Sequence, residues 1–277
     1  MIMTESLLEG RHIYYRTNEF RQDVPTLVFV HGLSGSSSAW TAYEKLFAKD
    51  YNIVTFDLRG HGKSGKHASY DDYALSHFVN DLRALLDHLN IQKCTLISHS
   101  FATLIALEFV LFDQDRIDGV VFLSPNFSIR QRALSASIAP FVLLITLLDK
   151  VVPGTLKPGK HVDYTKYPNT GDWNIPRMIA DVGNTTLLVY LYCTKHSCRF
   201  ERMGRLSEIK VPVLIMHGRK DTIFPVKNSI VIADRIPGAQ LIIIERTDHI
   251  LVLNNFKEVS AAIGEFLAKR VYTVYNS

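Results

Sequence analysis

The sequence predicts an α/β fold in which a mostly parallel, doubly wound sheet carries a helical insertion. Two patterns along the chain of 277 residues support this prediction. Short, continuous apolar runs, which suit strands buried on both faces of a parallel sheet, alternate with amphipathic segments of helical periodicity. Such alternation is typical of parallel strands joined by right-handed helical crossovers. The alternation stops once, between residues 126 and 207, where no strand-like run is found.

The strands are predicted from the positions of the apolar runs. Residues 8–16 alternate loosely between apolar and polar and are compatible with an edge strand. The buried strands are expected at residues 26–30, 52–56, 94–97, 119–123, 213–216 and 241–244. Helices are expected at 73–89 and 255–269, because apolar side chains recur there at spacings of three and four residues.

The segment that interrupts the alternation predicts a helical cap. It holds a strongly apolar helical stretch at 134–152, a loop rich in Pro, Gly and Lys, and a second helical region at 175–198. Ligands in open α/β sheets bind at the carboxyl ends of the strands, and we expect the cap to fold over that edge. We therefore predict a core domain made of residues 1–125 and 208–277 and a cap made of residues 126–207.

Composition and charge narrow the classes of partner and location. The net charge of +4 is scattered along the chain, which gives little support for a nucleic-acid partner. The three cysteines lack the spacing of metal ligands, so we expect free thiols in a reducing compartment and neither a metal nor a cofactor. The N-terminus lacks a signal-peptide pattern, and the longest apolar stretch, 138–148, is about half of a membrane span. A cytoplasmic protein is the expectation.

A nucleophile is predicted where one strand-like run gives way to a helical segment. The intervening residues 98–102, Ser-His-Ser-Phe-Ala, have the small-x-Ser-x-small pattern of a nucleophile elbow. If Ser98 were the nucleophile, the bulky Leu96 would occupy a position in the tight turn that needs a small residue. Ser100 has small residues at both flanking positions and is therefore the candidate nucleophile. The backbone N–H of Phe101 would face the group that Ser100 attacks.

A general base is expected at the end of another strand, after the nucleophile in the chain. His249 follows the last predicted strand by a few residues and is the candidate. His99 adjoins Ser100, but neighbouring side chains on so tight a turn diverge. A structural role is the preferred interpretation for the histidines that precede glycine in strand-end turns, namely His31, His61 and His217.

The orienting acid has two candidates, Asp221 and Asp248. Asp221 follows the predicted strand at 213–216, so it lies at the edge of the sheet where the base is expected. Asp248 adjoins His249, but adjacent residues cannot easily direct a carboxylate at the neighbour's ring nitrogen. Asp221 is therefore preferred, and a turn or helix-capping role is the alternative for it.

Five segments, each following a predicted strand, resemble the α/β-hydrolase family. They lie at residues 31–35, 57–64, 98–102, 218–221 and 248–249. The order Ser100, Asp221, His249 is also the chain order of the catalytic triads of that family. The resemblance implies the α/β-hydrolase fold and a second oxyanion-hole donor, the backbone N–H of Leu33. Ser98 and Ala102 replace the usual elbow glycines, and their β-carbons are expected to crowd the turn at Ser100.

Other patterns in the sequence bear on substrate and cofactor. The segments at 123–125 and 151–153 resemble the corresponding cap segments of monoacylglycerol lipases and related carboxylesterases. Residues 60–65 fit the dinucleotide-binding spacing G-x-G-x-x-G, and residues 62–64 resemble half of a phosphate-binding loop. No helix opens on this segment to receive a phosphate, and Asp57 stands where the second pattern needs glycine. Neither nucleotide pattern is therefore favoured.

These patterns together predict a serine esterase or lipase that cleaves carboxylic esters through an acyl-enzyme on Ser100. The apolar residues between 141 and 148 are compatible with packing inside the cap, and they also favour an acyl pocket or a transient contact with a lipid surface. Medium-chain acyl esters or monoacylglycerols are accordingly the expected substrates. The alternatives are a hydrolase that uses the same triad on a carbon–carbon, lactone or thioester bond, and a non-catalytic ligand receptor with the α/β-hydrolase fold.

Overall fold

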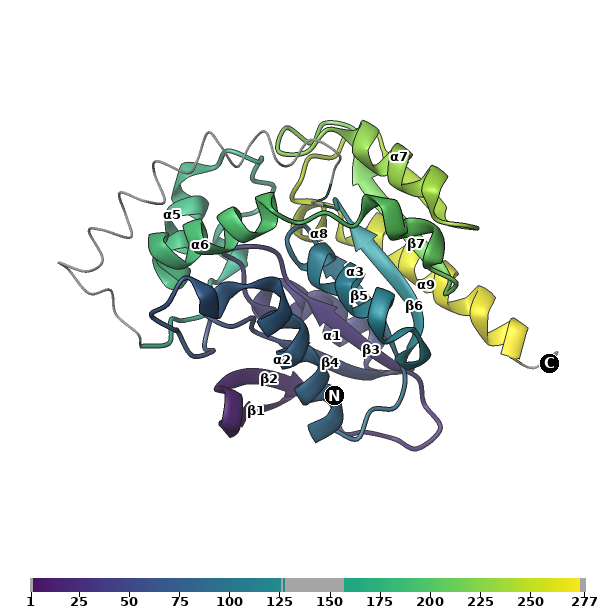
Figure 1. Cartoon of the computed structure of the whole chain (residues 1–277), viewed down its shortest axis with the longest axis horizontal. Helices are drawn as coiled ribbons and strands as arrows, with labels where there is room; N and C mark the ends of the chain where they lie inside the picture. The colour runs from purple at the N-terminus through teal and green to yellow at the C-terminus, as the bar shows by residue number, and fades with distance from the viewer. Residues whose placement is uncertain (1, 126, 128–156, 275–277) are drawn as a thin grey trace.

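The computed structural model describes residues 2–125, 127 and 157–274, and one sheet runs through its centre (Figure 1). The eight strands lie in the order β1-β2-β4-β3-β5-β6-β7-β8. The pairs β1–β2 and β2–β4 are antiparallel, and all the other pairs are parallel. The predicted fold class, a mostly parallel α/β sheet, is confirmed.

The strands from β3 to β8 lie close to the apolar runs from which they were predicted. They are β1 (Thr4–Leu8), β2 (Ile13–Thr17), β3 (Thr26–Val30), β4 (Asn52–Phe56), β5 (Cys94–His99), β6 (Ile117–Leu123), β7 (Val213–Gly218) and β8 (Gln240–Ile244). The helices are α1 (Thr41–Phe47), α2 (Leu75–His88), α3 (Ala102–Phe112), α5 (Ile175–Thr185), α6 (Leu187–Cys198), α7 (Val226–Arg235), α8 (Leu251–Asn254) and α9 (Phe256–Val274).

The N-terminal edge of the sheet differs from the single strand expected at residues 8–16. The chain forms two antiparallel strands there, β1 and β2, joined by a 3-10 turn at Glu9–Arg11. His12 reverses the chain by adopting a φ of 54°, in the left-handed region. β1 carries the mostly polar sequence Thr-Glu-Ser-Leu-Leu, so no apolar run marks it as a strand and the sequence pattern does not reveal the reversal.

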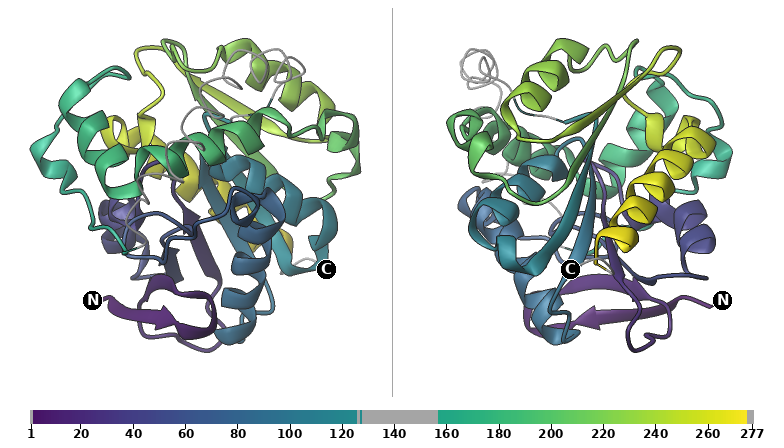
Figure 2. Two further views of the ribbon diagram at one scale, coloured as in Figure 1. Left: turned by 60° about the vertical axis from the view of Figure 1, so that its left-hand side comes forward. Right: turned by 90° about the vertical axis from the view of Figure 1, so that its right-hand side faces the viewer.

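Helices cover both faces of the sheet, as a doubly wound fold requires (Figure 2). Side chains of α2, α3 and α7 belong to the core cluster on one face, and side chains of α1, α8 and α9 belong to the cluster on the other. Successive residues of β5 show how the strand serves both layers. Leu96 packs in the first cluster and Ile97 in the second, because neighbouring side chains of a strand point to opposite faces.

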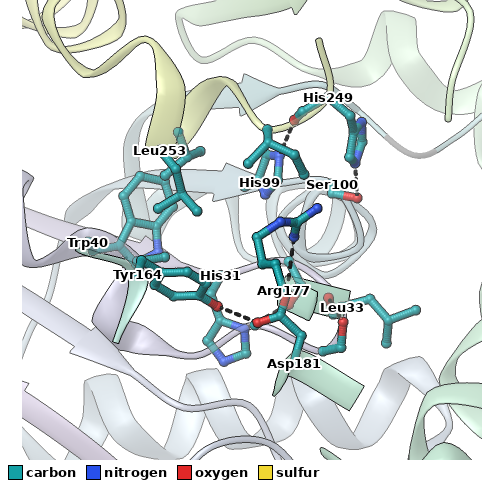
Figure 3. A pocket seen from close by; sticks show the side chains of 16 residues that line it. His31, Leu33, Trp40, His99, Ser100, Tyr164, Arg177, Asp181, His249 and Leu253 are labelled. Carbon is teal, nitrogen blue, oxygen red and sulfur yellow. Dashed lines mark hydrogen bonds and ion pairs between the residues drawn. The ribbon is translucent and has the colours of Figure 1, made fainter. Parts of the chain in front are cut away.

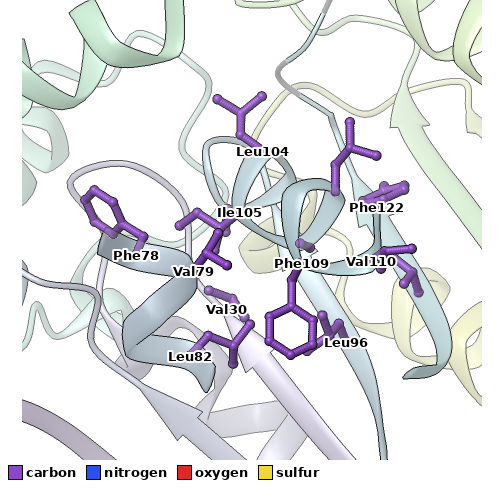
Figure 4. Close-up of a cluster of buried hydrophobic side chains, with 14 of the residues drawn as sticks. Val30, Phe78, Val79, Leu82, Leu96, Leu104, Ile105, Phe109, Val110 and Phe122 are labelled. Atoms are coloured by element: carbon purple, nitrogen blue, oxygen red, sulfur yellow. The ribbon is translucent and has the colours of Figure 1, made fainter. Parts of the chain in front are cut away.

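The helix that follows β5 is anchored deep in the molecule. α3 carries apolar residues around most of its circumference and is largely buried, because the sheet and α2 cover it. Figure 4 shows Leu104, Ile105 and Phe109 of this helix beside Phe78 and Val79 of α2. Each fully buried side chain of this size contributes about 1.5–3 kcal/mol. The first turn of α3 is therefore held in a fixed position relative to the end of β5.

The described part of the insertion between β6 and β7, residues 157–207, holds the helices α5 and α6, which follow a loop with a 3-10 turn at Tyr164–Lys166. α5 and α6 pack against each other there, and Val189, Tyr192 and Cys193 of α6 join the core cluster, where α6 contacts the 3-10 turn at Asp71–Tyr73. The boundaries of the cap, residues 126–207, stay a prediction, and its apolar stretch at 134–152 lies outside the described residues. Among the helices that the structure describes, none is both long and apolar enough to cross a membrane.

Candidate active site

Ser100 lies in the tight turn between β5, which ends at His99, and α3, which begins at Ala102. Its φ of 51° is in the left-handed region, which residues other than glycine seldom adopt. Two hydrogen bonds hold this strained turn. The N–H of Ser100 donates to the Leu123 carbonyl oxygen over 2.9 Å, and Thr103 Oγ1 donates to the Ser100 carbonyl oxygen over 2.6 Å. The turn thus fixes the Ser100 hydroxyl at the carboxyl edge of the sheet.

The two residues that replace the usual elbow glycines are accommodated in the packed turn. Ser98 and Ala102 are both fully buried, and the hydroxyl of Ser98 donates to the Val121 carbonyl oxygen over 3.2 Å. That hydroxyl is therefore engaged within the sheet, whereas Ser100 lines a cavity. The expected crowding by the two β-carbons does not keep Ser100 away from His249.

His249 connects Ser100 to Asp221 through its two ring nitrogens. Nε2 lies 2.8 Å from Ser100 Oγ, and Nδ1 lies 2.7 Å from Asp221 Oδ2. Figure 3 shows the His249 ring pointing at Ser100 from the loop that follows β8. Ser100 and His249 are both buried, as is the carboxylate of Asp221. The three residues, which follow three different strands, form one continuous chain of hydrogen bonds.

Several donors hold the carboxylate of Asp221. Its Oδ1 accepts the N–H groups of Ile223 and Phe224 over 2.9 and 2.8 Å, and its Oδ2 also lies 3.0 Å from His217 Nε2. Burial by itself would raise the pKa of Asp221, but the hydrogen bonds from His217 and His249 outweigh burial and hold the pKa below its ordinary value. His217, which the sequence suggested was only structural, thus contacts the acid. His217 lies in β7 and Asp221 in the loop that follows it, so no helical spacing in the sequence marks this contact.

Asp248 and His99, the alternative candidates for the acid and the base, form hydrogen bonds with other groups. Asp248 Oδ1 accepts the N–H of Ile250 over 2.9 Å. His99 Nε2 donates to the His249 carbonyl oxygen over 2.9 Å and so supports the loop that carries the base. Burial lowers the pKa of His99 to about 3, which makes the neutral imidazole the donor in this bond. Of the two candidate acids, the structure therefore places Asp221 against the ring of His249.

The predicted oxyanion-hole donors lie next to Ser100. Leu33, in the loop after β3, lines the same cavity as Ser100. Phe101 directly follows Ser100 in the elbow. The loop after β3 can pass close to the elbow because residue 32 is glycine. A Cβ at Gly32 would lie only 2.9 Å from His99 Nδ1. Within the described part of the chain, no hydrogen-bond acceptor is found for the N–H of Leu33 or of Phe101. Their role as donors to an oxyanion stays a prediction.

The insertion supplies a buried carboxylate that sequence analysis missed. Asp172 Oδ1 accepts the N–H of His249 over 2.8 Å. Its Oδ2 accepts both the N–H and the hydroxyl of Thr222, over 2.9 and 2.6 Å. Asp172 therefore connects the loop that carries His249 to the loop that carries Asp221. No pattern marks it, since it follows no strand and lies 77 residues before His249 in the chain.

Asp57 belongs to another of the family-like segments, and its carboxylate organises a turn. It accepts the N–H of Lys63 over 2.7 Å and lies 2.7 Å from Nε2 of His161, a residue of the insertion. Gly62 is required beside it, because its φ is 48° and a Cβ there would collide with the Asp57 carboxylate. The glycine that completes the G-x-G pattern thus serves this turn.

The cavity beside Ser100 is small and partly polar. Its volume is about 100 Å³. Three polar side chains of the insertion, Tyr164, Arg177 and Asp181, line it together with Ser100 and His249 (Figure 3). No sequence pattern marks these three residues, because they lie in a segment without strand ends or a recognisable motif.

Known proteins resemble this chain across most of its length. A family model described as "alpha/beta hydrolase fold" matches residues 25–256. The "Putative carbamate hydrolase RutD" of Pseudomonas syringae pv. syringae (strain B728a) is 28% identical over 269 residues, which cover 89% of this chain and 95% of the relative.

Solved structures share the fold at low sequence identity. A structure from a study of carboxylesterases of the Thaumarchaeon Nitrososphaera gargenis aligns with a TM-score of 0.73 at 18% identity, covering 98% of this chain and 100% of that chain. The enol-lactonase from Burkholderia xenovorans LB400 aligns with a TM-score of 0.70 at 20% identity, covering 96% and 100%. Since the family model spans all the strands from β3 to β8, this chain belongs to the α/β-hydrolase fold family.

Proposed function

We propose that this chain is a serine hydrolase that cleaves carboxylic esters through an acyl-enzyme on Ser100. The observation that carries the proposal is the unbroken hydrogen-bond chain from Ser100 through His249 to Asp221, with contacts of 2.8 and 2.7 Å. A serine hydroxyl is a weak nucleophile unless a base removes its proton, and this arrangement provides the base and its orienting acid.

The geometry supports a two-step reaction. His249 accepts the proton of Ser100 at Nε2 as the hydroxyl oxygen attacks the ester carbonyl, and the imidazolium then gives this proton to the departing alcohol. Asp221 accepts a hydrogen bond from Nδ1–H, which fixes the tautomer and stabilises the positive charge. A water molecule, activated in the same way by His249, hydrolyses the acyl-enzyme and releases the acid.

The negative charge that develops on the carbonyl oxygen needs donors, and the N–H groups of Leu33 and Phe101 are the proposed pair. Leu33 lines the cavity and Phe101 follows Ser100 in the chain, and no acceptor for either N–H group is found within the described residues. One preorganised donor of this kind lowers the barrier by about 3 kcal/mol.

The cavity favours short substrates over the medium-chain esters and monoacylglycerols expected from the sequence. A volume of about 100 Å³ holds a small acyl group, and its lining includes an Arg, an Asp and a Tyr side chain. The expectation of a long acyl chain or a lipid contact rests on residues 134–152, which lie outside the described residues. We therefore propose short-chain esters as the substrate class.

Carbamates and lactones form the second substrate class, because the same attack by Ser100 opens either group. A relative named as a carbamate hydrolase and a structural neighbour named as an enol-lactonase favour it. The receptor alternative is less favoured, since all three side chains of the hydrogen-bond chain are in contact.

The test is to measure hydrolysis of p-nitrophenyl acetate, butyrate, hexanoate and octanoate, together with labelling by a fluorophosphonate probe. We expect activity that is highest on the short esters, and Ser100→Ala should abolish both turnover and labelling while leaving the melting temperature nearly unchanged. Ser98→Ala is the matched control in the same turn, and it should keep activity and labelling. Activity or labelling that survives in Ser100→Ala would refute the assignment of the nucleophile.

A further inference from the structure

Three side chains of the insertion form a polar cluster in the cavity of Ser100. Arg177 and Asp181 come from α5, and Tyr164 comes from the 3-10 turn at Tyr164–Lys166. Figure 3 shows Arg177 between Asp181 and the elbow that carries Ser100. The mechanism proposed above uses none of the three. Their place in the cavity makes them candidates for contacts with the substrate.

Arg177 has a donor that the protein leaves unused. Its Nη1 donates to Asp181 Oδ2 over 3.0 Å, and its Nη2 donates to the Asp172 carbonyl oxygen over 3.2 Å. Its Nε is buried, and no acceptor for it is found within the described residues. The whole residue is 6% exposed, so water has little access to it. A buried guanidinium N–H without an acceptor costs free energy that a suitable ligand recovers.

The neighbours of Arg177 hold it in place before any ligand arrives. The two oxygens of Asp181 are engaged by different partners, since Oδ1 accepts the Tyr164 hydroxyl over 3.0 Å and Oδ2 accepts Arg177. The backbone N–H of Arg177 donates to Asn174 Oδ1 over 2.9 Å, which caps the first turn of α5. Because the side chain is already ordered, an acceptor that binds Nε does not incur the entropic cost of immobilising it.

We propose that Arg177 determines the substrate specificity of this enzyme by binding, through Nε–H, an oxygen acceptor other than the scissile carbonyl. This inference rests on the proposed esterase function. The substrate class is a short ester whose acyl group carries a second carbonyl or carboxylate oxygen. An apolar acyl group of the same size leaves the buried N–H unpaired, and such a mismatch is the basis of strong discrimination.

The charge of the cluster predicts which acceptor is preferred. Asp181 balances the charge of Arg177, and its carboxylate repels a second anion in so small a cavity. A neutral carbonyl oxygen is therefore preferred in the wild-type protein. Removing the charge of Asp181 shifts the preference toward a carboxylate.

Three ethyl esters whose acyl groups match in size test the proposal. Ethyl isocaproate carries an apolar branch, ethyl levulinate a carbonyl and monoethyl succinate a carboxylate at the same position, and ethanol release gives kcat/KM for each. We expect wild-type protein to favour levulinate over isocaproate by roughly tenfold or more, as for a hydrogen bond to a charged donor. Arg177→Met should bring this ratio close to one.

A ratio of two substrates on one variant cancels a general loss of activity, so a disturbed triad does not imitate loss of recognition. Arg199→Met, at an exposed position after α6, is the matched control and should keep the wild-type ratio. Asp181→Asn should raise the succinate to levulinate ratio several-fold.

A levulinate to isocaproate ratio near one in the wild-type protein, or an unchanged ratio in Arg177→Met, would overturn the role of Arg177. Such an enzyme would still be labelled by fluorophosphonate at Ser100, so the proposed function would stand. Absence of both labelling and ester turnover would instead refute the proposed function itself.

Discussion

Individual residues at the elbow combine strain with tight packing. Ser100 keeps a φ of 51° although it has a β-carbon, and its contact with His249 is nonetheless 2.8 Å. A non-glycine residue in this region costs on the order of 1–3 kcal/mol and persists only where the surroundings enforce it. Burial of Ser98 and Ala102 on either side supplies that enforcement. The side chains that replace the usual glycines thus help to hold the turn.

Substituting the family's usual glycine at one of these positions is therefore expected to weaken the fold without improving catalysis. Ser98→Gly removes the hydrogen bond to the Val121 carbonyl oxygen and makes the strand end more flexible. We expect a loss of about 1–2 kcal/mol of stability, seen as a lower melting temperature, and a kcat/KM for short esters within about threefold of wild type. A tenfold rise in kcat/KM would instead show that the Ser98 side chain hinders Ser100.

At the scale of elements, the ends of the parallel strands were the predictable part of the site. Ser100, Asp221 and His249 follow β5, β7 and β8, and the carboxyl ends of these strands meet at one edge by the rules of the fold. Asp172 and Arg177 could not be found in this way. They belong to the helical insertion, whose position over the edge depends on packing between side chains distant in sequence.

Asp172 links two of these elements, and we expect it to act as a positioning residue. In Asp172→Asn the amide oxygen replaces only one of the two carboxylate oxygens, so either His249 N–H or the Thr222 donors face an NH₂ group. A small displacement of the base relative to Ser100 lowers the rate steeply. We predict a fall in kcat of roughly 10- to 100-fold with a smaller change in KM, and an equally slower reaction with fluorophosphonate.

Trp173→Phe is the matched control for this experiment. It removes one hydrogen bond to Thr222 Oγ1 from the adjacent, exposed residue and leaves the Asp172 contacts in place. Activity of this variant should stay within a few-fold of wild type. If Asp172→Asn keeps full kcat and labelling rate, the link between the two loops has no role in positioning the base.

At the scale of the whole molecule, the fold class was predictable because the buried strands carry continuous apolar runs and amphipathic helices such as α2 lie between them. The antiparallel β1–β2 edge was not, since β1 is largely polar and carries no apolar run. The arrangement of the insertion was the least predictable part of the fold. The insertion supplies Tyr164, Arg177 and Asp181 to the cavity. The ionisation of Asp181 is expected to affect the free energy of unfolding of the whole protein.

Asp181 is expected to make stability depend on pH. Burial raises its pKa to about 6, against the opposing effects of Arg177 and the Tyr164 hydroxyl. The folded state therefore binds this proton more tightly than the unfolded state, and the stability that the proton provides is lost as pH rises from about 4 to 6. Asp181→Asn removes this loss. Its melting temperature relative to wild type should increase between pH 5 and pH 8 by an amount equivalent to about 1 kcal/mol.

Tyr164→Phe provides the matched control, because it removes a hydrogen bond that lowers the pKa of Asp181. In this variant the loss of stability should still begin near pH 4 but continue to a higher pH than in wild type, so the total loss is larger. Thermal melts of the three proteins in buffers from pH 5 to pH 8 measure both effects. A difference between Asp181→Asn and wild type that stays constant over this range would mean that Asp181 remains ionised throughout, and that the cavity holds a permanent ion pair with Arg177.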